Sequence, residues 1–266
     1  MRKLIYFIGM MINCFAMYAQ YDSVFATAEY SFSHIDDTTQ LSFPRTAKMK
    51  LFLAKKISLY IDYNRMNATL EVRKSGAWPA GELEKASMVD SYTKNFQNSQ
   101  LTFIAPAGSN YYSIEEKIPV IDWVIIQETK VIKGFPCQKA TCKFRGRNYE
   151  AWFCSQIPYS NGPWKLGGLP GLILEAYDVN KEVTFTFVGF EYITDLPVIE
   201  IPKGYEKKTP QEYNIYREAL NKDANARNLA AASSEGNVYT GQPTTGSGVA
   251  RRRWKVINNP LEKIVN

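Results

Sequence analysis

The chain has 266 residues, 45% of them hydrophobic, which is enough for one sizeable core and short for two domains. Its formal net charge of +6 is mild, and its dense basic run at residues 251–255 suits a charged edge strand better than a contact for phosphates or lipid headgroups. The sequence contains no nucleic-acid-binding motif and a single histidine, His34. These features disfavour a nucleic-acid partner, a zinc site and most histidine-based catalysis.

Residues 1–20 have the pattern of a secretory signal peptide, in which Arg2 and Lys3 precede an apolar stretch that ends at the small residue Ala19. One asparagine interrupts the stretch, which makes it short for a membrane span of about 20 apolar residues. We therefore expect cleavage after Ala19 and export, to the periplasm or to an association with the outer membrane. Residues 21–266 would then form one β-rich domain without a transmembrane segment. Loss of two basic residues and no acidic ones lowers the formal charge from +6 to +4.

Alternating apolar and polar residues predict a long series of β-strands. The first two segments are residues 25–32 and 49–63, and the second is either a strand pair or one bent strand. A polar stretch at residues 64–98 contains one candidate helix, residues 81–89. Further strands then follow at short intervals, at residues 101–104, 111–117, 124–132, 138–144, 149–154, 172–177 and 183–192. Strands without intervening helices favour an antiparallel sheet over an α/β fold.

An antiparallel meander of this length must twist and curl. The predicted fold is therefore mainly β: a single large curved antiparallel sheet or half-barrel, with one or two short helices and long loops. Its concave side needs a cover, either the irregular residues 157–170 or a helix at residues 210–232, where apolar residues recur at helical spacing. Residues 233–248, rich in Ser, Gly and Thr, predict a mobile loop, and residues 251–257 predict the last strand.

The most informative stretch is residues 161–178, NGPWKLGGLPGLILEAYD. Its glycines and prolines keep the backbone out of regular structure immediately before an apolar strand. We expect Gly171 to have a positive φ, so that its replacement by valine destabilises the fold. The alternative is an exposed recognition loop, but Leu172, Ile173 and Leu174 are too apolar to leave in water.

This stretch resembles the signature of the GLPGLI family of secreted bacterial proteins, which is formed here by Gly168, Leu169, Pro170, Gly171, Leu172 and Ile173. Further similarity covers residues 132–141, 144–147, 151–152, 157–158 and 162–165, with weaker matches near residues 30–38 and 259–262. The resemblance spans nearly the whole exported chain. It implies an address outside the cytoplasm, but the family has no assigned activity.

Three cysteines, Cys137, Cys142 and Cys154, remain after signal removal, in a compartment that permits disulfides. Cys137 stands where the GLPGLI family has a cysteine. Cys142 and Cys154 both depart from the family pattern, on two strands predicted to form a hairpin, which suggests a disulfide between them. The alternative is three buried thiols in a β core.

Aromatic and basic residues around the signature give the candidate ligand or partner surface: Trp152, Arg145, Arg147, Trp164 and Lys165. Core packing is the simpler explanation for the tryptophans, and a solvated turn for the arginines, but both residue types also line binding sites. We expect no cofactor and no metal site.

Our leading hypothesis is a non-enzymatic periplasmic or outer-membrane-associated binding protein for an apolar or peptide-like ligand. One alternative is an accessory interaction subunit of an outer-membrane transport or assembly complex, whose partner is an outer-membrane protein. A second alternative is a hydrolase that uses His34, with Cys137 as a candidate nucleophile from a strand far away in the sequence.

Overall fold

The computed structural model describes residues 22–64, 90–107, 110–193, 198–199, 205–234 and 257–263. Several predicted elements lie wholly or almost wholly outside these ranges: the signal peptide, the helix at residues 81–89, the loop at residues 233–248 and the strand at residues 251–257.

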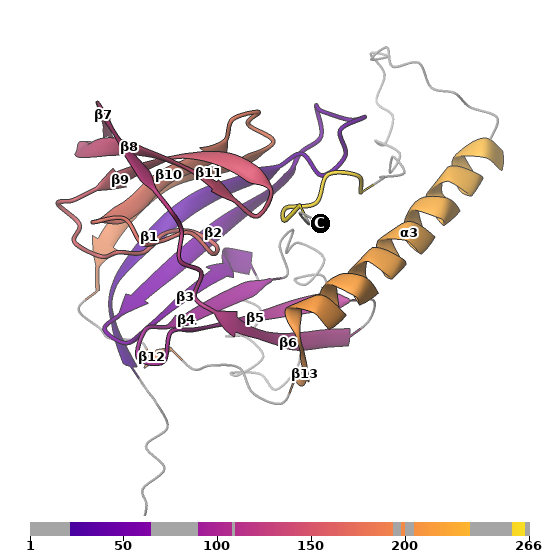
Figure 1. Ribbon diagram of the computed structural model, residues 1–266, viewed down its shortest axis with the longest axis horizontal. Helices are drawn as coiled ribbons and strands as arrows, with labels where there is room; N and C mark the ends of the chain where they lie inside the picture. The colour runs from indigo at the N-terminus through magenta and orange to yellow at the C-terminus, as the bar shows by residue number, and fades with distance from the viewer. Residues whose placement is uncertain are drawn as a thin grey trace, which may run out of the picture.

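The fold is mainly β and is built on one large sheet that stays open, as the sequence predicts (Figure 1). Its first meander contains β1 (Asp22–His34), β2 (Arg45–Ala54), β3 (Ile57–Asp62), β4 (Ser91–Asn95), β5 (Gln100–Ala107) and β6 (Asn110–Lys117). Its second contains β7 (Val124–Ile132), β8 (Phe135–Phe144), β9 (Arg147–Cys154), β10 (Leu172–Asp178) and β11 (Val183–Tyr192). Because β1 pairs with both β2 and β11, the two antiparallel meanders form one continuous sheet.

The connection between the meanders shows how strongly the sheet curls. β6 and β7 stand near opposite ends of the strand order, yet residues 118–123 alone connect them. A chain of that length reaches at most about 25 Å, so the two ends of the sheet must approach each other. Two short strands complete the sheet: β12 (Val198–Ile199) pairs with β1, and β13 (Glu206–Lys208) pairs in parallel with β6. The result is a half-barrel with a concave side.

Two elements differ from the sequence prediction. β4 was not predicted, because its sequence SYTKN is polar, yet all five of its side chains are buried. Helix α3 (Pro210–Ser234) is confirmed at the predicted place, but with 25 residues it is not short. Thr209 and Glu212 form a capping box at its start, where each residue's backbone N–H donates to the other's side chain at 2.8 and 3.2 Å.

A segment of irregular structure, residues 157–171, fills the concave side; we call it the signature segment. Trp164, Leu166 and Leu169 of this segment are buried in the core, and the Trp164 ring stacks on Phe185 at 6.1 Å. Trp164 has a φ of +54°, which is rare for a bulky residue and is tolerated only where packing enforces it. The concave side is therefore occupied by the chain's own aromatic and aliphatic side chains.

Gly171 closes the signature segment in a conformation that glycine alone adopts without strain. Its φ is +151°, as expected for a positive value, and a Cβ at this position would lie 2.2 Å from the carbonyl oxygen of Cys154. Leu172, Ile173 and Leu174 follow it fully buried. The backbone path of the signature is thus part of the packed core.

Candidate functional site

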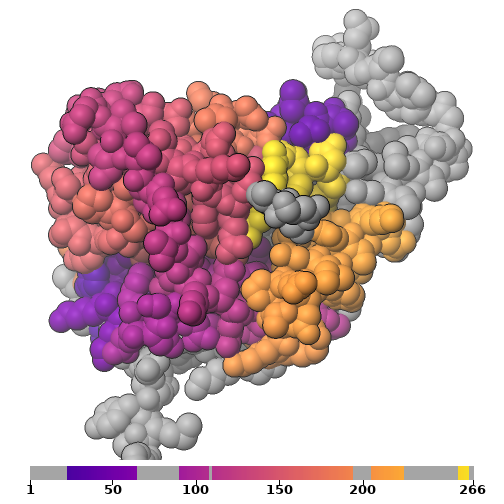
Figure 2. Space-filling view, in the orientation of Figure 1, coloured from indigo at the N-terminus to yellow at the C-terminus, as the bar shows by residue number. Residues whose placement is uncertain are grey.

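A cavity of about 220 Å³ lies between the concave side of the sheet, α3 and the C-terminal segment, residues 257–263. In the space-filling view these C-terminal residues (yellow) lie between α3 (orange) and the second meander (Figure 2). Most lining residues are polar or charged. They come from five regions: His34, Asp36 and Arg45 near β1 and β2; Asp90, Tyr92, Phe103 and Pro106 on or beside β4 and β5; Lys165; Pro210, Tyr213, Asn214, Arg217 and Asn221 on α3; and Ile257, Pro260, Leu261 and Glu262.

Arg147 ties the hairpin of β8 and β9 to the C-terminal segment next to this cavity. Its side chain is buried, and Nη1 donates to Asp178 at 2.5 Å and to Glu182 at 2.8 Å. Nη2 donates to Asn259 Oδ1 and the Pro260 carbonyl, each at 2.7 Å, and Nε donates to the Leu261 carbonyl at 3.2 Å. All five N–H donors of the guanidinium are therefore used. Burial raises the pKa of Glu182, but the hydrogen bonds from Arg147 and Asn259 outweigh it and leave that pKa below its ordinary value.

Lys165 forms a second ionic group at the wall of the cavity. Its buried Nζ lies 2.7 Å from Glu116 and 2.7 Å from Glu262, and 4.3 Å from the centre of the Phe103 ring. Arg145 contacts the same two carboxylates at 2.9 and 3.7 Å. We call Arg145, Arg147, Lys165 and their four carboxylate partners the paired cluster. Every basic side chain in this cluster faces at least two carboxylates.

Lys94 on β4 holds the signature segment to the sheet. Its fully buried Nζ donates to Asn161 Oδ1 at 2.8 Å and to the carbonyls of Gly162 and Leu166 at 3.2 and 2.5 Å. Three acceptors match the three donors of an ammonium group, although burial lowers the pKa of Lys94 to about 7. This contact explains why a polar strand such as β4 belongs in the interior.

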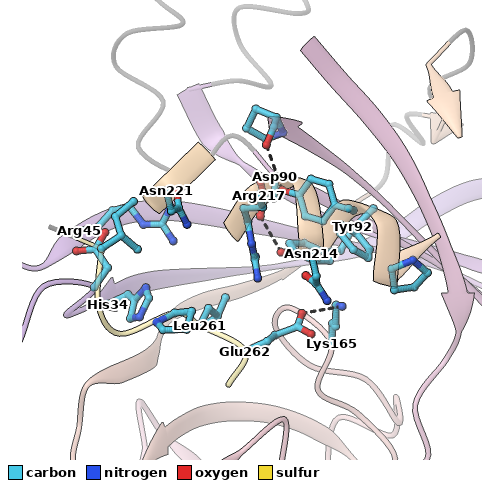
Figure 3. Close-up of a pocket in the computed structure, with 17 residues that line it drawn as sticks. His34, Arg45, Asp90, Tyr92, Lys165, Asn214, Arg217, Asn221, Leu261 and Glu262 are labelled. Atoms are coloured by element: carbon cyan, nitrogen blue, oxygen red, sulfur yellow. Dashed lines mark hydrogen bonds and ion pairs between the residues drawn. The ribbon is translucent and has the colours of Figure 1, made fainter. Parts of the chain in front are cut away.

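Three other cavity residues, His34, Arg45 and Arg217, form a contrasting group that we call the open cluster. His34 and Arg45 are direct cross-strand partners on β1 and β2, and Arg217 extends from α3 toward Leu261 and Glu262 (Figure 3). His34 is 2% exposed, yet no group within the described ranges meets hydrogen-bond geometry at either of its ring nitrogens or at Arg45 Nε. Within the described ranges, neither Arg45 nor Arg217 forms an ion pair.

Burial, and then the positive charge of Arg45, lower the pKa of His34 to about 4. Arg147 adds to this shift, whereas Asp36 and a contact with the backbone of Asn259 oppose it without reversing it. His34 is therefore neutral at pH 7, with one ring N–H donor and one acceptor nitrogen at the wall of a cavity that Arg45 also lines.

The five residues of the predicted ligand or partner surface do not share one surface. Trp152 is only 4% exposed and packs in the core, where Lys130 covers its ring at 4.4 Å. Trp164 and Arg147 are buried among core and ionic partners. Arg145 remains half-exposed, and Lys165 lines the cavity. A binding role stays a prediction for the last two.

The predicted disulfide between Cys142 and Cys154 is wrong. All three cysteines in the described chain are free, buried thiols. The turn at Arg145 and Gly146 has two residues with positive φ, so Phe144 pairs with Arg147 and Cys142 pairs with Tyr149. Cys154 lies five residues further along β9, next to Phe153, which pairs with Gln138. The two sulfurs are consequently too far apart to bond.

The pairing of His34 with Cys137 that a cysteine hydrolase needs is not formed. Four strand-to-strand steps separate β1 from β8 in the sheet, and neighbouring strands lie about 4.8 Å apart. Burial also raises the pKa of the Cys137 thiol to about 12, which keeps it protonated and unreactive. In addition, no serine, threonine or cysteine of the described chain lines the cavity.

Two further searches concern the described ranges alone. Within them, the structure holds no group of three or more His, Cys, Asp or Glu side chains that could bind a metal ion. No helix within them is both long and apolar enough to cross a membrane.

Comparison with known proteins connects one part of this site to a family. A family model described as a protein of unknown function (Porph_ging) matches residues 143–175, a short stretch that includes Arg145, Arg147 and Lys165. A search of curated proteins finds no match.

The fold is similar to that of PNGF-II in two crystal forms. In one, the TM-score is 0.52 at 15% identity, over 73% of this chain and 33% of that chain; in the other it is 0.50 at 16%, over 72% and 32%. This chain thus spans about a third of the PNGF-II chain, and at such identity the likeness concerns the fold alone. The comparisons therefore support the fold, and they assign no activity.

Proposed function

We propose that this protein is an exported, non-enzymatic binding protein of the GLPGLI type, and that its ligand is a small polar molecule held in the cavity beneath α3. The signal-peptide pattern supports export. The hexapeptide at residues 168–173 and the family match over residues 143–175 support the family assignment.

The observation that carries the binding role is the open cluster. Buried polar groups in folded proteins almost always have hydrogen-bond partners, because an unsatisfied one costs about 1 to 3 kcal/mol. His34 has two unsatisfied ring nitrogens at a cavity wall, and Arg45 Nε adds a third unsatisfied group. Tyr60, Tyr149 and Trp164 also keep one unsatisfied polar atom each, but they do not line the cavity. In the open cluster three such atoms belong to residues at a cavity wall, where a ligand can offset the cost, as functional sites commonly do.

The polar lining also changes the ligand class that the sequence suggested. An apolar carrier needs a large apolar space on the concave side, but Trp164, Leu166 and Leu169 occupy that space. The cavity is smaller than the roughly 300 to 1,000 Å³ of sites for drug-sized ligands. A compact polar ligand fits these properties better than an apolar or peptide-like one.

Native mass spectrometry of the exported protein, purified without denaturation, tests the proposal. We expect a small bound compound, either retained from the cell envelope or taken up from an envelope extract. Asn214→Trp, which places an indole in the cavity from α3, should abolish its binding. Glu218→Trp, an exposed position on the same helix, is the matched control and should leave binding intact. Equal retention by both variants would show that the cavity is not the binding site.

A second candidate, the accessory interaction subunit, is favoured by the edge strand β7. Val124, Ile125 and Val131 are 60%, 44% and 70% exposed there, whereas the opposite edge ends in the short, charged β13. An exposed apolar edge is suited to pairing with a strand of another chain. Photocrosslinking from residue 125 in intact envelopes should then trap one partner specifically, and Val131→Lys should abolish the adduct.

A further inference from the structure

We propose that the ligand of this cavity carries a carboxylate, which Arg45 and Arg217 bind beside His34. The inference rests on the proposed function, because it names the chemical class of ligand for the same cavity. Two of the residues in this proposal, Arg45 and Arg217, were not among the candidates predicted from the sequence.

The geometry of the open cluster brings two cations and a neutral imidazole to one place. His34 and Arg45 face the cavity from paired positions, whose Cβ atoms lie about 5 Å apart in an antiparallel ladder. Arg217 approaches from the helix on the other side, and its described contact is with the Tyr213 ring at 5.5 Å. Two guanidinium groups that form no ion pair within the described ranges thus line one small cavity together with a buried imidazole, an arrangement suited to an anion.

The acidic lining residues show which anion fits. Glu262 is already paired with Lys165, and Asp90 accepts a hydrogen bond from the Tyr92 hydroxyl at 2.9 Å. Asp36 lies near His34 and acts on its pKa. These three carboxylates disfavour a compact dianion such as phosphate, whose second charge they would repel. A single carboxylate has the planar shape that a guanidinium binds through two parallel hydrogen bonds.

The size of the site limits the rest of the ligand. A cavity of 220 Å³ corresponds to roughly seven water molecules at about 30 Å³ each, which is room for a small organic acid and not for a lipid or a folded peptide. Asn214 and Asn221 line the helix side and offer neutral hydrogen-bonding groups to the remainder of such a molecule.

Titrations at pH 7 and constant ionic strength test this class with defined probes. Acetate and succinate represent carboxylates, inorganic phosphate represents a compact dianion, and glycerol represents a neutral polar compound. His34 is the chain's single histidine, so its ring resonances report binding at the site without ambiguity. We expect both carboxylates to shift these resonances in a saturable manner, more strongly than phosphate, with no effect of glycerol.

Arg217→Gln should weaken carboxylate binding by about tenfold or more, because it removes a charge-assisted hydrogen bond. Lys222→Gln removes the same charge from an exposed position on α3 and should leave the affinity unchanged. Preferred binding of phosphate or glycerol, or equal effects of the two substitutions, would overturn the carboxylate assignment. The comparison of Asn214→Trp with Glu218→Trp decides separately whether the cavity binds any ligand.

Discussion

The paired cluster and the open cluster lie around the same cavity but differ in how their charges are satisfied. Arg147 uses all five N–H donors on acceptors of the protein, and Lys165 lies between two carboxylates. His34 and Arg45 hold polar atoms that the protein leaves without a partner. The difference teaches that buried charge alone does not mark a binding site. Charge that the fold itself neutralises locks segments together, whereas polar groups left unsatisfied at a cavity are available to a ligand.

The largest effect should come from breaking the paired cluster at its centre. Arg147→Met preserves the length of the side chain but leaves the buried Asp178 without its counter-ion, while the half-buried Glu182 keeps only Lys263 at 3.5 Å. We expect a loss of about 3 to 5 kcal/mol in the free energy of unfolding, the usual result of removing one partner of a buried pair. Chemical denaturation measures it. A loss below 1 kcal/mol would mean that the cluster does not hold the C-terminal segment to the hairpin.

Gly171→Val acts on the same side of the cavity, through the segment that carries Lys165. A side chain at φ +151° is strained, and its Cβ would clash with the Cys154 carbonyl at 2.2 Å, which belongs to backbone and cannot move aside easily. We expect destabilisation of about 2 to 4 kcal/mol. Gly134→Val is an informative control, because it has a similar φ strain but nothing within 4 Å of its Cβ. An unchanged unfolding midpoint for Gly171→Val would show that the signature has no structural role.

Lowering the pH should reduce the stability of the fold through His34, the titratable residue of the open cluster. Its pKa is about 4 in the folded chain and about 6.5 in the unfolded chain, so the unfolded chain binds more protons between these values. Stability that is present above pH 6.5 is therefore lost as the pH falls toward 4, by up to about 3 kcal/mol. His34→Gln, which does not titrate, should lack this part of the loss. Because carboxylates also titrate in this range, the difference between the two stability curves is the quantity to measure, and parallel curves would contradict the low pKa.

Most of the sheet follows from local sequence, but the clusters do not. Alternation located the strands of both meanders, while β4 escaped because Lys94 gains its acceptors from the distant signature segment. Arg145, Arg147 and Lys165 stood out as candidates, yet their ion pairs depend on Glu116, Asp178 and Glu182, which other strands and turns bring to them. Arg45 and Arg217 carry no local signal, because only pairing with β1 and docking of α3 bring them to the wall of the same cavity as His34. The wrong disulfide shows the same limit at short range, since one two-residue turn sets the register of the whole hairpin.

The smallest effect on stability should come from the open cluster, and this prediction is the strictest test of the comparison. Arg45→Gln removes a cation whose Nε has no partner, so we expect the free energy of unfolding at pH 7 to change by no more than about 0.5 kcal/mol. The same substitution removes the positive charge beside His34, so the pKa of that imidazole should rise from about 4 toward its ordinary value, while burial continues to hold it down. Titration of the single histidine by NMR measures this shift directly. A loss of stability comparable to that of Arg147→Met would show that Arg45 is a structural residue like those of the paired cluster. A preserved stability together with a raised pKa would instead locate a cation that the fold maintains beside His34 without needing it for its own stability.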